Sequence, residues 1–226
     1  MKYLKIREGI FIKRINRFIA HVEIDGQVEV CHVKNTGRCK EILIEGSKVF
    51  LEESDSPHRK TKFDLISVYK GDRLINIDSQ VPNKMFKEWV LKGNLFKDLN
   101  LIKSEVFYGD SRFDFYVEYE DKKAFVEIKG VTLEENRVVL FPDAPTTRGV
   151  KHLNELIYAR KNGYEAYIIF IIQMNGVKYF TPNEYTHKEF KDALLSCKNN
   201  GVNILAFDSI VSKDEIYINE SVKVLV

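Results

Sequence analysis

The sequence has no apolar run of the length that a membrane-spanning helix needs. Its opening stretch, MKYLKIREGIF, also lacks the uninterrupted apolar core and the small-residue cleavage site of a signal peptide. We therefore expect a soluble cytoplasmic protein that has no membrane as a partner.

Cysteine is scarce. Cys31, Cys39 and Cys197 are an odd number with no paired spacing, as is typical of a reducing compartment. Cys31 and the adjacent His32 do not predict a zinc site, because neighbouring strand residues face opposite ways and no fourth ligand follows at finger-like spacing. We expect ordinary half-buried thiols.

A large excess of either charge is missing. Lys and Arg number 35 against 33 Asp and Glu, so the net charge is +2 and any basic surface for nucleic acid has to be local. The candidate stretches are FIKRINRF, SPHRKTK and TTRGVK. The patterns GxxxxGK[ST], GxGxxG and GxSxG are absent, which argues against P-loop NTPases, Rossmann oxidoreductases and serine hydrolases.

The predicted secondary structure of the chain changes near residue 82, from strands alone to strands and helices. Hydrophobic residues make up 44% of the 226 residues, which is enough for a folded core. Residues 1–82 predict an all-β domain, a small barrel or sandwich, because β-branched and aromatic runs alternate with turns such as DGQ, EGS and KGD. The expected strands are IFIKRINRFIAHVEID, QVEVCHV, SKVFLEE, FDLISVYK and RLINID.

Residues 83–226 indicate a second domain, an α/β or α+β fold in which helices pack on a central sheet. The wholly apolar AYIIFIIQ, at 166–173, predicts a strand that is buried on both faces. The other expected elements are helices at 81–96, 147–162 and 187–198, strands at 104–107, 112–119, 123–130 and 137–141, and closing strands in NILAF and EIYINESVKVLV.

The expected strand FVEIKGVT carries charges where a core strand needs apolar residues. Alternation sends Glu127 and Lys129 to one face and Ile128 to the other, and Asp114 lies on the preceding expected strand. A hairpin of the two strands brings both carboxylates together, where Mg²⁺ or Mn²⁺ could bind them and the Ile128 carbonyl. Lys129 could then orient or deprotonate a water, or offset charge on a phosphoryl transition state.

This Asp…Glu-x-Lys pattern is that of the PD-(D/E)xK nucleases, although such short strings also arise by chance. The alternative is a surface strand with an intrastrand Glu–Lys pair. The apolar neighbours Phe125, Val126 and Ile128 favour a buried strand. Burying a charge costs several kcal/mol unless the charge is paired or bound to metal, so the nuclease hypothesis has physical support.

The expected helix after FPDAP carries further candidates. His152 and Glu155 share one helix face and could flank an active site, and Arg148 and Lys151 near its start could contact phosphates. Glu105 is a candidate accessory ligand on an earlier strand. For Glu155 and Glu105 the alternatives, a solvated helix face and a polar strand residue, remain open.

The chain resembles the sugar fermentation stimulation protein A family over nearly its whole length. The resemblance is carried by RINRF, HVKNTGRCKEIL, SPHRKTKFDL, VPNKM, SRFDF, FVEIKGVTL, FPDAPTTRGVKHLNEL and the TP after the apolar strand. It implies an N-terminal OB-type β-barrel, here residues 1–82, and a PD-(D/E)xK nuclease-like domain, residues 83–226, with a central mixed sheet flanked by helices. It also implies metal-binding acids at Asp114 and Glu127 and the catalytic lysine at Lys129.

The sequence departs from the family pattern at two positions. Phe113 stands where the nuclease pattern has proline before the aspartate, and Cys39 stands where a bulkier apolar residue such as methionine is expected. Neither change affects a proposed catalytic group. No residues form a recognisable sugar site, so we interpret the link to sugar metabolism as indirect.

The resemblance implies that the barrel binds the nucleic acid, since OB-folds bind single strands by aromatic stacking in a basic groove. The expected contacts are Arg14, Arg17, Phe18, Asn35, Thr36 and Arg38. A core position for Phe18 and an ion pair for Arg17 are the alternatives.

The leading hypothesis is a nuclease that uses Mg²⁺ or Mn²⁺ and acts on DNA or RNA, with single strands as the expected substrate. The alternative is a DNA-binding regulator, linked to genes of sugar metabolism, whose nuclease-like domain is not used for catalysis. The residue pattern leaves open the choice between DNA and RNA, endo- or exonuclease action, and the oligomeric state.

Overall fold

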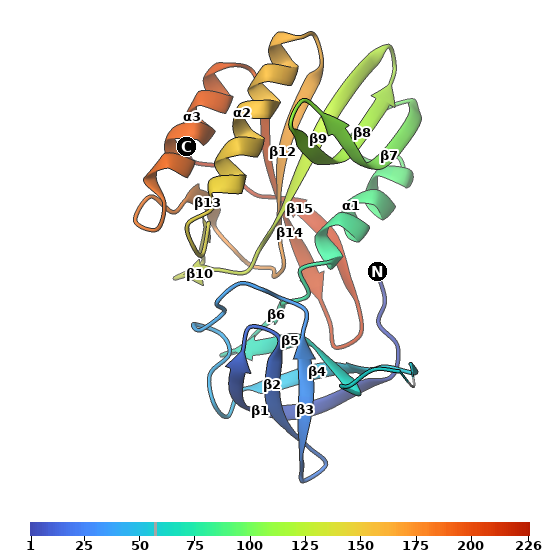
Figure 1. The fold of residues 1–226 in the computed structure, drawn as a ribbon, viewed down its shortest axis with the longest axis vertical. Helices are drawn as coiled ribbons and strands as arrows, with labels where there is room; N and C mark the ends of the chain where they lie inside the picture. Colours follow the sequence, from blue (N-terminus) through green and yellow to red (C-terminus); the bar gives the residue numbers. More distant parts are fainter. Residues whose placement is uncertain (57) are drawn as a thin grey trace.

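The computed structural model describes residues 1–56 and 58–226, which form two lobes stacked along the long axis of the molecule (Figure 1). The lower lobe is a sheet with strand order β3-β2-β1-β4-β5-β6, and a further pairing of β3 with β5 closes it into a barrel. This confirms the expected OB-type barrel. Its strands are β1 (Ile6–Asn16), β2 (Ile19–Ile24), β3 (Gln27–Val33), β4 (Lys48–Glu53), β5 (Phe63–Lys70) and β6 (Arg73–Asn76).

The run IFIKRINRFIAHVEID, which the sequence presents as one stretch, is the hairpin of β1 and β2. The chain reverses at Arg17 and Phe18, where the Asn16 side-chain oxygen accepts hydrogen bonds from the main-chain N–H groups of Phe18 (2.8 Å) and Ile19 (3.1 Å). An Asx-type turn of this kind needs no glycine. The strand-like residue pattern therefore shows no turn signal at this point, and the sequence does not reveal the chain reversal.

The upper lobe is a six-stranded mixed sheet with helices on both faces, as expected (Figure 1). Its strand order is β15-β14-β12-β9-β8-β7, with β12 parallel to both β9 and β14 and the outer pairs antiparallel. The strands are β7 (Leu99–Tyr108), β8 (Ser111–Tyr119), β9 (Lys122–Val131), β12 (Glu165–Ile172), β14 (Asn203–Val211) and β15 (Ile216–Ser221). A small second sheet contains β10 (Glu134–Glu135), β11 (Val138–Phe141) and β13 (Tyr179–Pro182).

Three helices cover the large sheet. Helix α1 (Val81–Leu91) packs Met85 and Phe86 into one core cluster with Phe115 and Val126, whereas α2 (Thr147–Lys161) and α3 (Lys188–Asn199) pack into the other. The bounds of α2 and α3 agree with the sequence to about one residue. Helix α1 ends before the predicted residue 96, because Gly93 adopts a left-handed conformation (φ 86°) that terminates the helix.

The three cysteines are more deeply buried than expected. Cys31, Cys39 and Cys197 are free thiols in the core, and burial raises the pKa of each to about 12. They behave as small hydrophobic residues there.

No helix in the described parts of the chain is both long and apolar enough to cross a membrane.

Polar contacts join the two lobes. The Gln173 side-chain N–H donates to Asn76 Oδ1 (2.9 Å) and to the Asp78 carbonyl (3.0 Å), while the Asn76 main-chain N–H donates to the Gln173 carbonyl (3.0 Å). The first residues of the chain also belong to this junction rather than to the barrel, since the Tyr3 N–H donates to the Asp214 carbonyl (2.8 Å). Both lobes are thus held in one relative position.

An ion cluster adds to the junction. Glu134 of the upper lobe is 5% exposed, and its carboxylate contacts Lys70 Nζ (2.9 Å) and Arg73 Nη1 (3.0 Å) of the β5–β6 hairpin. Burial opposes the ionisation of Glu134, but the hydrogen bond from Lys70 and further donors outweigh it, so the pKa of Glu134 lies below its usual range. Glu134 is therefore an ionised anchor between the lobes.

Glu134→Gln keeps the shape of the side chain and removes the charge shared by Lys70 and Arg73. We expect the free energy of unfolding, measured by urea denaturation, to fall by about 2 kcal/mol, as for lost hydrogen bonds to charged groups. Glu135→Gln is the matched control, because Glu135 is the exposed neighbour on β10. Equal stability of the two variants would show that this cluster does not hold the lobes together.

Candidate metal site and nucleic-acid interface

The hairpin of β8 and β9 places Asp114 next to Glu127, as the sequence predicts. The two strands pair from Tyr119–Lys122 to Phe115–Val126 and separate beyond that point. Asp114 fills the gap between them. Its Oδ2 accepts a hydrogen bond from the main-chain N–H of Ile128 (2.8 Å), and its Oδ1 accepts one from the side chain of Asn83 on α1 (2.7 Å).

Glu127 is a buried carboxylate, with 3% of its surface exposed. Its Oε1 accepts a hydrogen bond from Lys129 Nζ (2.5 Å) and also contacts Nδ1 of His152 on α2. Its Oε2 is buried and has no hydrogen-bond partner among the described residues. Burial opposes ionisation, but the hydrogen bond from His152 and the charge of Lys129 outweigh it, so the pKa of Glu127 lies below its usual range. Glu127 is thus an ionised group with one free oxygen.

The two carboxylates repel each other. Burial and the nearby charge of Glu127 together raise the pKa of Asp114 above its usual value, despite the hydrogen bonds that it accepts. A cation between them would remove both the repulsion and the unsatisfied state of Glu127 Oε2. The donor set therefore fits a divalent ion that prefers oxygen ligands.

The main-chain carbonyl of Ile128 is the third oxygen of this set. The N–H and C=O of a strand residue point to the same side, and the Ile128 N–H points to Asp114, so the carbonyl does as well. In the described parts of the chain, no three His, Cys, Asp or Glu side chains gather as a complete ion cage. Waters and substrate oxygens would have to complete the coordination, as Mg²⁺ commonly requires.

Helix α2 contributes unequally to the site. Thr146 caps it by accepting a hydrogen bond from the Gly149 N–H (3.0 Å), which fixes where the helix starts. His152 is buried and contacts Glu127, as described, and Arg148 Nε lies 3.4 Å from His152 Nε2. His152 and Arg148 are therefore the two residues of α2 that hydrogen bonds connect to the carboxylate pair.

Lys151 and Glu155 lie at the β7–β8 turn instead of the metal site. Lys151 Nζ donates to the Asp110 carbonyl (2.7 Å). Glu155 packs on Gly109, where an added Cβ would come within 2.8 Å of Glu155 Oε2. Both residues hold the hairpin that carries Asp114, and their roles as a phosphate contact and an accessory site residue stay predictions.

Glu105 lies on β7 across from Asp114 in the strand register, but its side chain contacts a different partner. Its main chain has a positive φ of 56°, and its exposed carboxylate lies 3.6 Å from the guanidinium of Arg112. This irregular conformation turns the side chain into solvent. In this structure Glu105 is a polar strand residue paired with Arg112, and its role as an accessory ligand stays a prediction.

In the barrel, Arg14 and Asn35 build the loop that was expected to bind nucleic acid. The Arg14 guanidinium donates to five main-chain carbonyls, those of Asn16, Arg17, Asn35, Gly37 and Arg38. The Asn35 side chain accepts from the Gly37 N–H (2.7 Å) and donates to the Ile77 carbonyl (2.8 Å). The geometry gives both residues a supporting role in this loop, and their direct contact with nucleic acid stays a prediction.

The remaining predicted contacts lie on the surface of the barrel. Phe18 is 43% exposed, with the Arg17 guanidinium 4.9 Å from its ring centroid, and Thr36 and Arg38 are exposed as well. Phe18 is therefore not a core residue. A surface groove of about 490 Å³, the barrel groove, runs beside them and is lined by Phe11, Ile12, Lys13, Arg14, Asn16, Arg17, Thr36, Gly37, Arg38, Lys40, Leu43 and Glu45.

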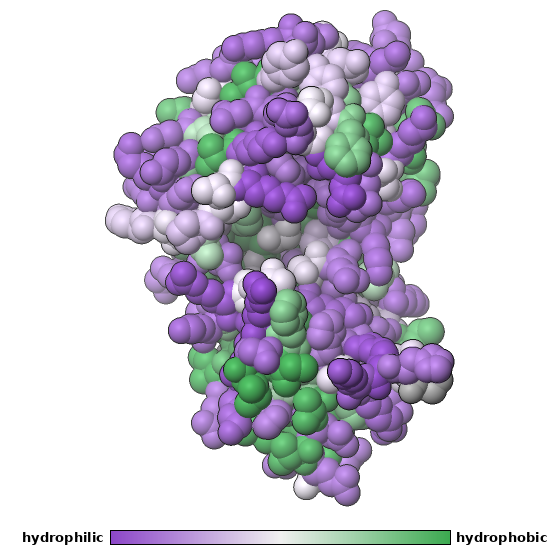
Figure 2. Space-filling model, viewed as in Figure 1, coloured by the Kyte–Doolittle hydropathy of each residue, from purple (hydrophilic) through white to green (hydrophobic). Residues whose placement is uncertain are grey.

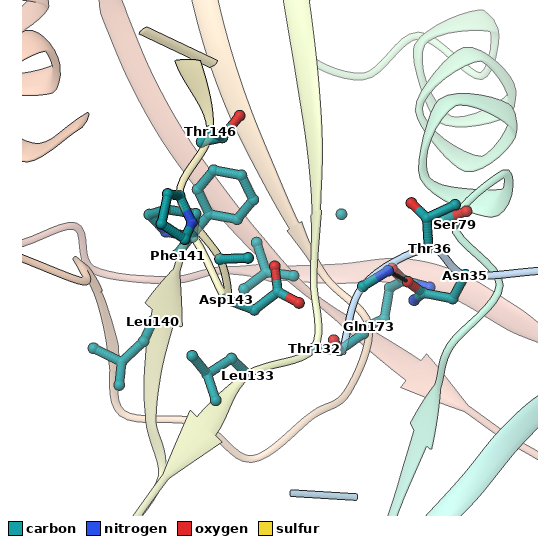
Figure 3. A pocket seen from close by; sticks show the side chains of 16 residues that line it. Asn35, Thr36, Ser79, Thr132, Leu133, Leu140, Phe141, Asp143, Thr146 and Gln173 are labelled. Atoms are coloured by element: carbon teal, nitrogen blue, oxygen red, sulfur yellow. Dashed lines mark hydrogen bonds between the residues drawn. The ribbon is translucent and has the colours of Figure 1, made fainter. Parts of the chain in front are cut away.

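A second hollow, the interdomain cleft, lies between the two lobes and measures about 320 Å³ (Figures 2 and 3). Thr36 and Gly37 line both the cleft and the barrel groove, so the two hollows are neighbours that share this loop. Gly130, the residue after Lys129, lies in its wall. The cleft is lined by residues 35–37, Ser79, residues 130–133, residues 140–146 and Gln173.

Two family models match the chain in succession. The "SfsA N-terminal OB domain" matches residues 12–77, and the "Sugar fermentation stimulation protein RE domain" matches residues 80–215. The chain belongs to the sugar fermentation stimulation protein family. This confirms the resemblance seen in the sequence and the OB nature of the barrel.

Known relatives match over their full length. A "Sugar fermentation stimulation protein homolog" of Clostridium beijerinckii is 63% identical over 225 residues, which cover 100% of both chains. One of Ruminiclostridium cellulolyticum is 61% identical over 224 residues, 99% of both chains. The solved structure of Pyrococcus furiosus SfsA in complex with Ca²⁺ is 28% identical, has a TM-score of 0.91, and covers 100% of this chain and 98% of that one.

Sequence reasoning overlooked three residues of this region: Asn83, Asp143 and Gln173. Asn83 lies in VPNKM, which indicated only the family resemblance. Asp143 lies in FPDAP, which indicated only that resemblance and the start of a helix. Gln173 is the polar end of an otherwise apolar strand, and this change was the available signal. Their roles depend on contacts between elements that are distant in sequence.

Arg14→Ala and Arg17→Ala each remove one positive charge from the barrel groove. Comparing the two variants distinguishes an arginine that supports the loop from one that is exposed on the surface. We expect Arg14→Ala to lower the free energy of unfolding by about 2 kcal/mol or more, because it leaves loop carbonyls without their donor. Arg17→Ala should change it by less than about 0.5 kcal/mol, since its side chain is exposed. Urea denaturation of both variants provides the comparison, and a stable Arg14→Ala protein would contradict the supporting role.

Proposed function

We propose that this protein is a divalent-metal-dependent nuclease of the cytoplasm that hydrolyses phosphodiester bonds of DNA or RNA, and that the barrel is its nucleic-acid-binding domain. One observation carries the proposal. Glu127 is an ionised, buried carboxylate whose Oε2 has no hydrogen-bond partner in the described part of the chain, and it lies beside the carboxylate of Asp114 and the ammonium of Lys129. Lys129 and His152 compensate one oxygen of Glu127, and a cation would compensate the other and reduce the repulsion from Asp114.

Asp114, Glu127 and the Ile128 carbonyl would hold Mg²⁺ or Mn²⁺. When bound, the ion supplies Lewis-acid activation of water and of the phosphoryl oxygens. His152 holds Glu127 by Oε1, which leaves Oε2 for the ion, and Asn83 holds Asp114 against the gap between the strands. Lys129 is 18% exposed, so its ammonium can leave Glu127 Oε1 to orient the attacking water or stabilise charge on the phosphate.

Two further observations support the proposal. The related Pyrococcus furiosus protein was solved in complex with Ca²⁺, a hard cation with the same preference for oxygen ligands. In the barrel, exposed Arg17, Phe18 and Arg38 combine basic and stacking groups, as proteins that bind single strands do. This combination favours single-stranded nucleic acid as the substrate.

Asp114→Asn tests the metal site by isothermal titration calorimetry with Mn²⁺. We expect wild-type protein to show one site that the variant loses, because a neutral amide replaces one of two anionic ligands. Asp110→Asn is the control, since Asp110 is an exposed acid of the adjacent turn. A variant that titrates like wild type would remove the metal from the proposal.

Lys129→Met tests catalysis. The change keeps the apolar stem and removes the charge, so cleavage with Mg²⁺ or Mn²⁺ should fall about a hundredfold or more, whereas substrate affinity in Ca²⁺ should change little. Lys123→Met, on the same face of β9 but exposed, should cut normally. Normal cutting by Lys129→Met would make Lys129 only the structural partner of Glu127.

The assay that decides between enzyme and regulator uses purified protein with single-stranded DNA, duplex DNA and RNA. Cleavage that needs Mg²⁺ or Mn²⁺ and stops with EDTA is the expected result. Binding without cleavage under every metal condition would instead favour a DNA-binding regulator whose nuclease-like domain is not catalytic.

A further inference from the structure

The interdomain cleft has a size and position that neither the metal site nor the barrel groove explains. Its volume of about 320 Å³ is at the lower end for small-molecule sites, so it can admit one nucleoside-sized group but no folded element. Gly130, directly after Lys129, lies in its wall, and Thr36 and Gly37 line both the cleft and the barrel groove. The cleft therefore lies between the barrel groove and the strand that carries Lys129.

One wall of the cleft is apolar and rigid. It comes from the end of β11 and the loop after it, with Leu140, Phe141 and Pro142, and Figure 3 shows Phe141 on the side of the cleft that faces Asn35 and Thr36. The Phe141 ring packs against Phe170 and Phe190, with centroids 5.7 Å and 5.1 Å away. This packing holds the wall in place, and it suits a flat aromatic group.

The cleft also presents two fixed hydrogen-bond acceptors. Asp143 accepts the Arg38 N–H through Oδ2 (3.2 Å), and no hydrogen bond among the described residues uses its Oδ1. Gln173 is 1% exposed and donates through Nε2 to Asn76 and Asp78, which orients its amide. Within the described chain its Oε1 accepts no hydrogen bond, and this oxygen lies where a Cβ on Gly130 would come within 2.7 Å.

These groups define what the cleft can bind. None of the 16 lining residues that the structure describes is Lys or Arg, and one is an aspartate, so a phosphate is repelled. A ligand that donates hydrogen bonds from a flat apolar body satisfies both walls. The base of a nucleotide with an exocyclic amino group, as in adenine, cytosine or guanine, has this chemistry.

We propose that the interdomain cleft binds one unpaired nucleobase of the substrate, next to the phosphate that is cut, with the amino edge of the base toward Asp143 and Gln173. This inference rests on the proposed nuclease function and deepens it. The base must leave its stack and its pairing partner to enter the cleft, so the site selects single-stranded or locally unpaired nucleic acid. It also makes the protein sensitive to base identity at one position.

The test measures binding of short single-stranded oligonucleotides to the full-length protein in Ca²⁺ by fluorescence anisotropy, with one abasic sugar moved along the sequence. We expect one position, adjacent to the cut mapped in Mg²⁺, at which the abasic sugar weakens wild-type binding about tenfold, the range for a lost stacked base. Thr132→Phe fills the cleft from its floor and should weaken binding of the intact oligonucleotide similarly. The variant should no longer respond to the abasic sugar at that position.

Ser104→Phe is the matched control, because it adds the same ring at an exposed position of β7 outside the cleft. It should respond to the abasic scan as wild type does. If Thr132→Phe keeps the wild-type penalty at that position, the cleft does not hold a base.

Asp143→Asn gives an independent measurement that does not depend on filling the cleft. The amide keeps an acceptor for the Arg38 N–H but offers an N–H donor in place of a carboxylate oxygen. We expect the preference for adenine, cytosine or guanine over thymine at the sensitive position to fall about tenfold or to reverse. A purely structural role for Asp143 would weaken all four bases equally, and that result would overturn the proposal.

The outcomes for the cleft and for the nuclease are distinguishable. Oligonucleotide binding with a sensitive position but no cleavage in any metal retains the cleft and rejects the nuclease. Metal-dependent cleavage with no sensitive position retains the nuclease and rejects the cleft. An absence of nucleic-acid binding in Ca²⁺ at every protein concentration tested rejects both.

Discussion

The buried charge of Glu127 is the constraint on which the rest of the site depends. A carboxylate in the interior of a sheet costs several kcal/mol unless it is paired, and here Lys129 and His152 both pair with the same oxygen, Oε1. The contact with His152 sets the position of α2 against β9. The other oxygen lies near Asp114 and accepts no hydrogen bond from the residues that the structure describes, and it is the oxygen that the proposed cation would use.

The two lobes act as one body because their junction is polar and specific. Hydrogen bonds that join Gln173 to Asn76 and Asp78, and the ion cluster around Glu134, would lose their geometry if the lobes rotated. The barrel groove, the interdomain cleft and the carboxylate pair are therefore arranged before any ligand arrives. Such preorganisation lowers the entropy cost of binding a ligand.

Local features of the fold could be predicted from the sequence, and so could the centre of the site. The hairpin that pairs Asp114 with Glu127 is visible because strand periodicity and a short connection decide it. The apolar run of β12 and the bounds of α2 are equally local. The β1–β2 turn was concealed, since Asn16 makes it with a side chain that resembles any polar residue of a strand.

Residue patterns predict an all-β first domain, a second domain with a central sheet, and the pairing of Asp114 with Glu127 beside Lys129, because periodicity and short-range spacing encode these features. The OB type of the barrel and the mixed sheet were expected from the family resemblance. Tertiary structure alone decided which of the other polar residues serve the site. Arg14 supports a loop by donating to five main-chain carbonyls, and Lys151 and Glu155 contact the β7–β8 turn. Asn83 contacts Asp114, which is 31 positions away in the sequence, and Gln173 contacts Asn76, which is 97 positions away. A side chain takes the partner that folding brings within about 3 Å, and sequence separation does not encode that distance.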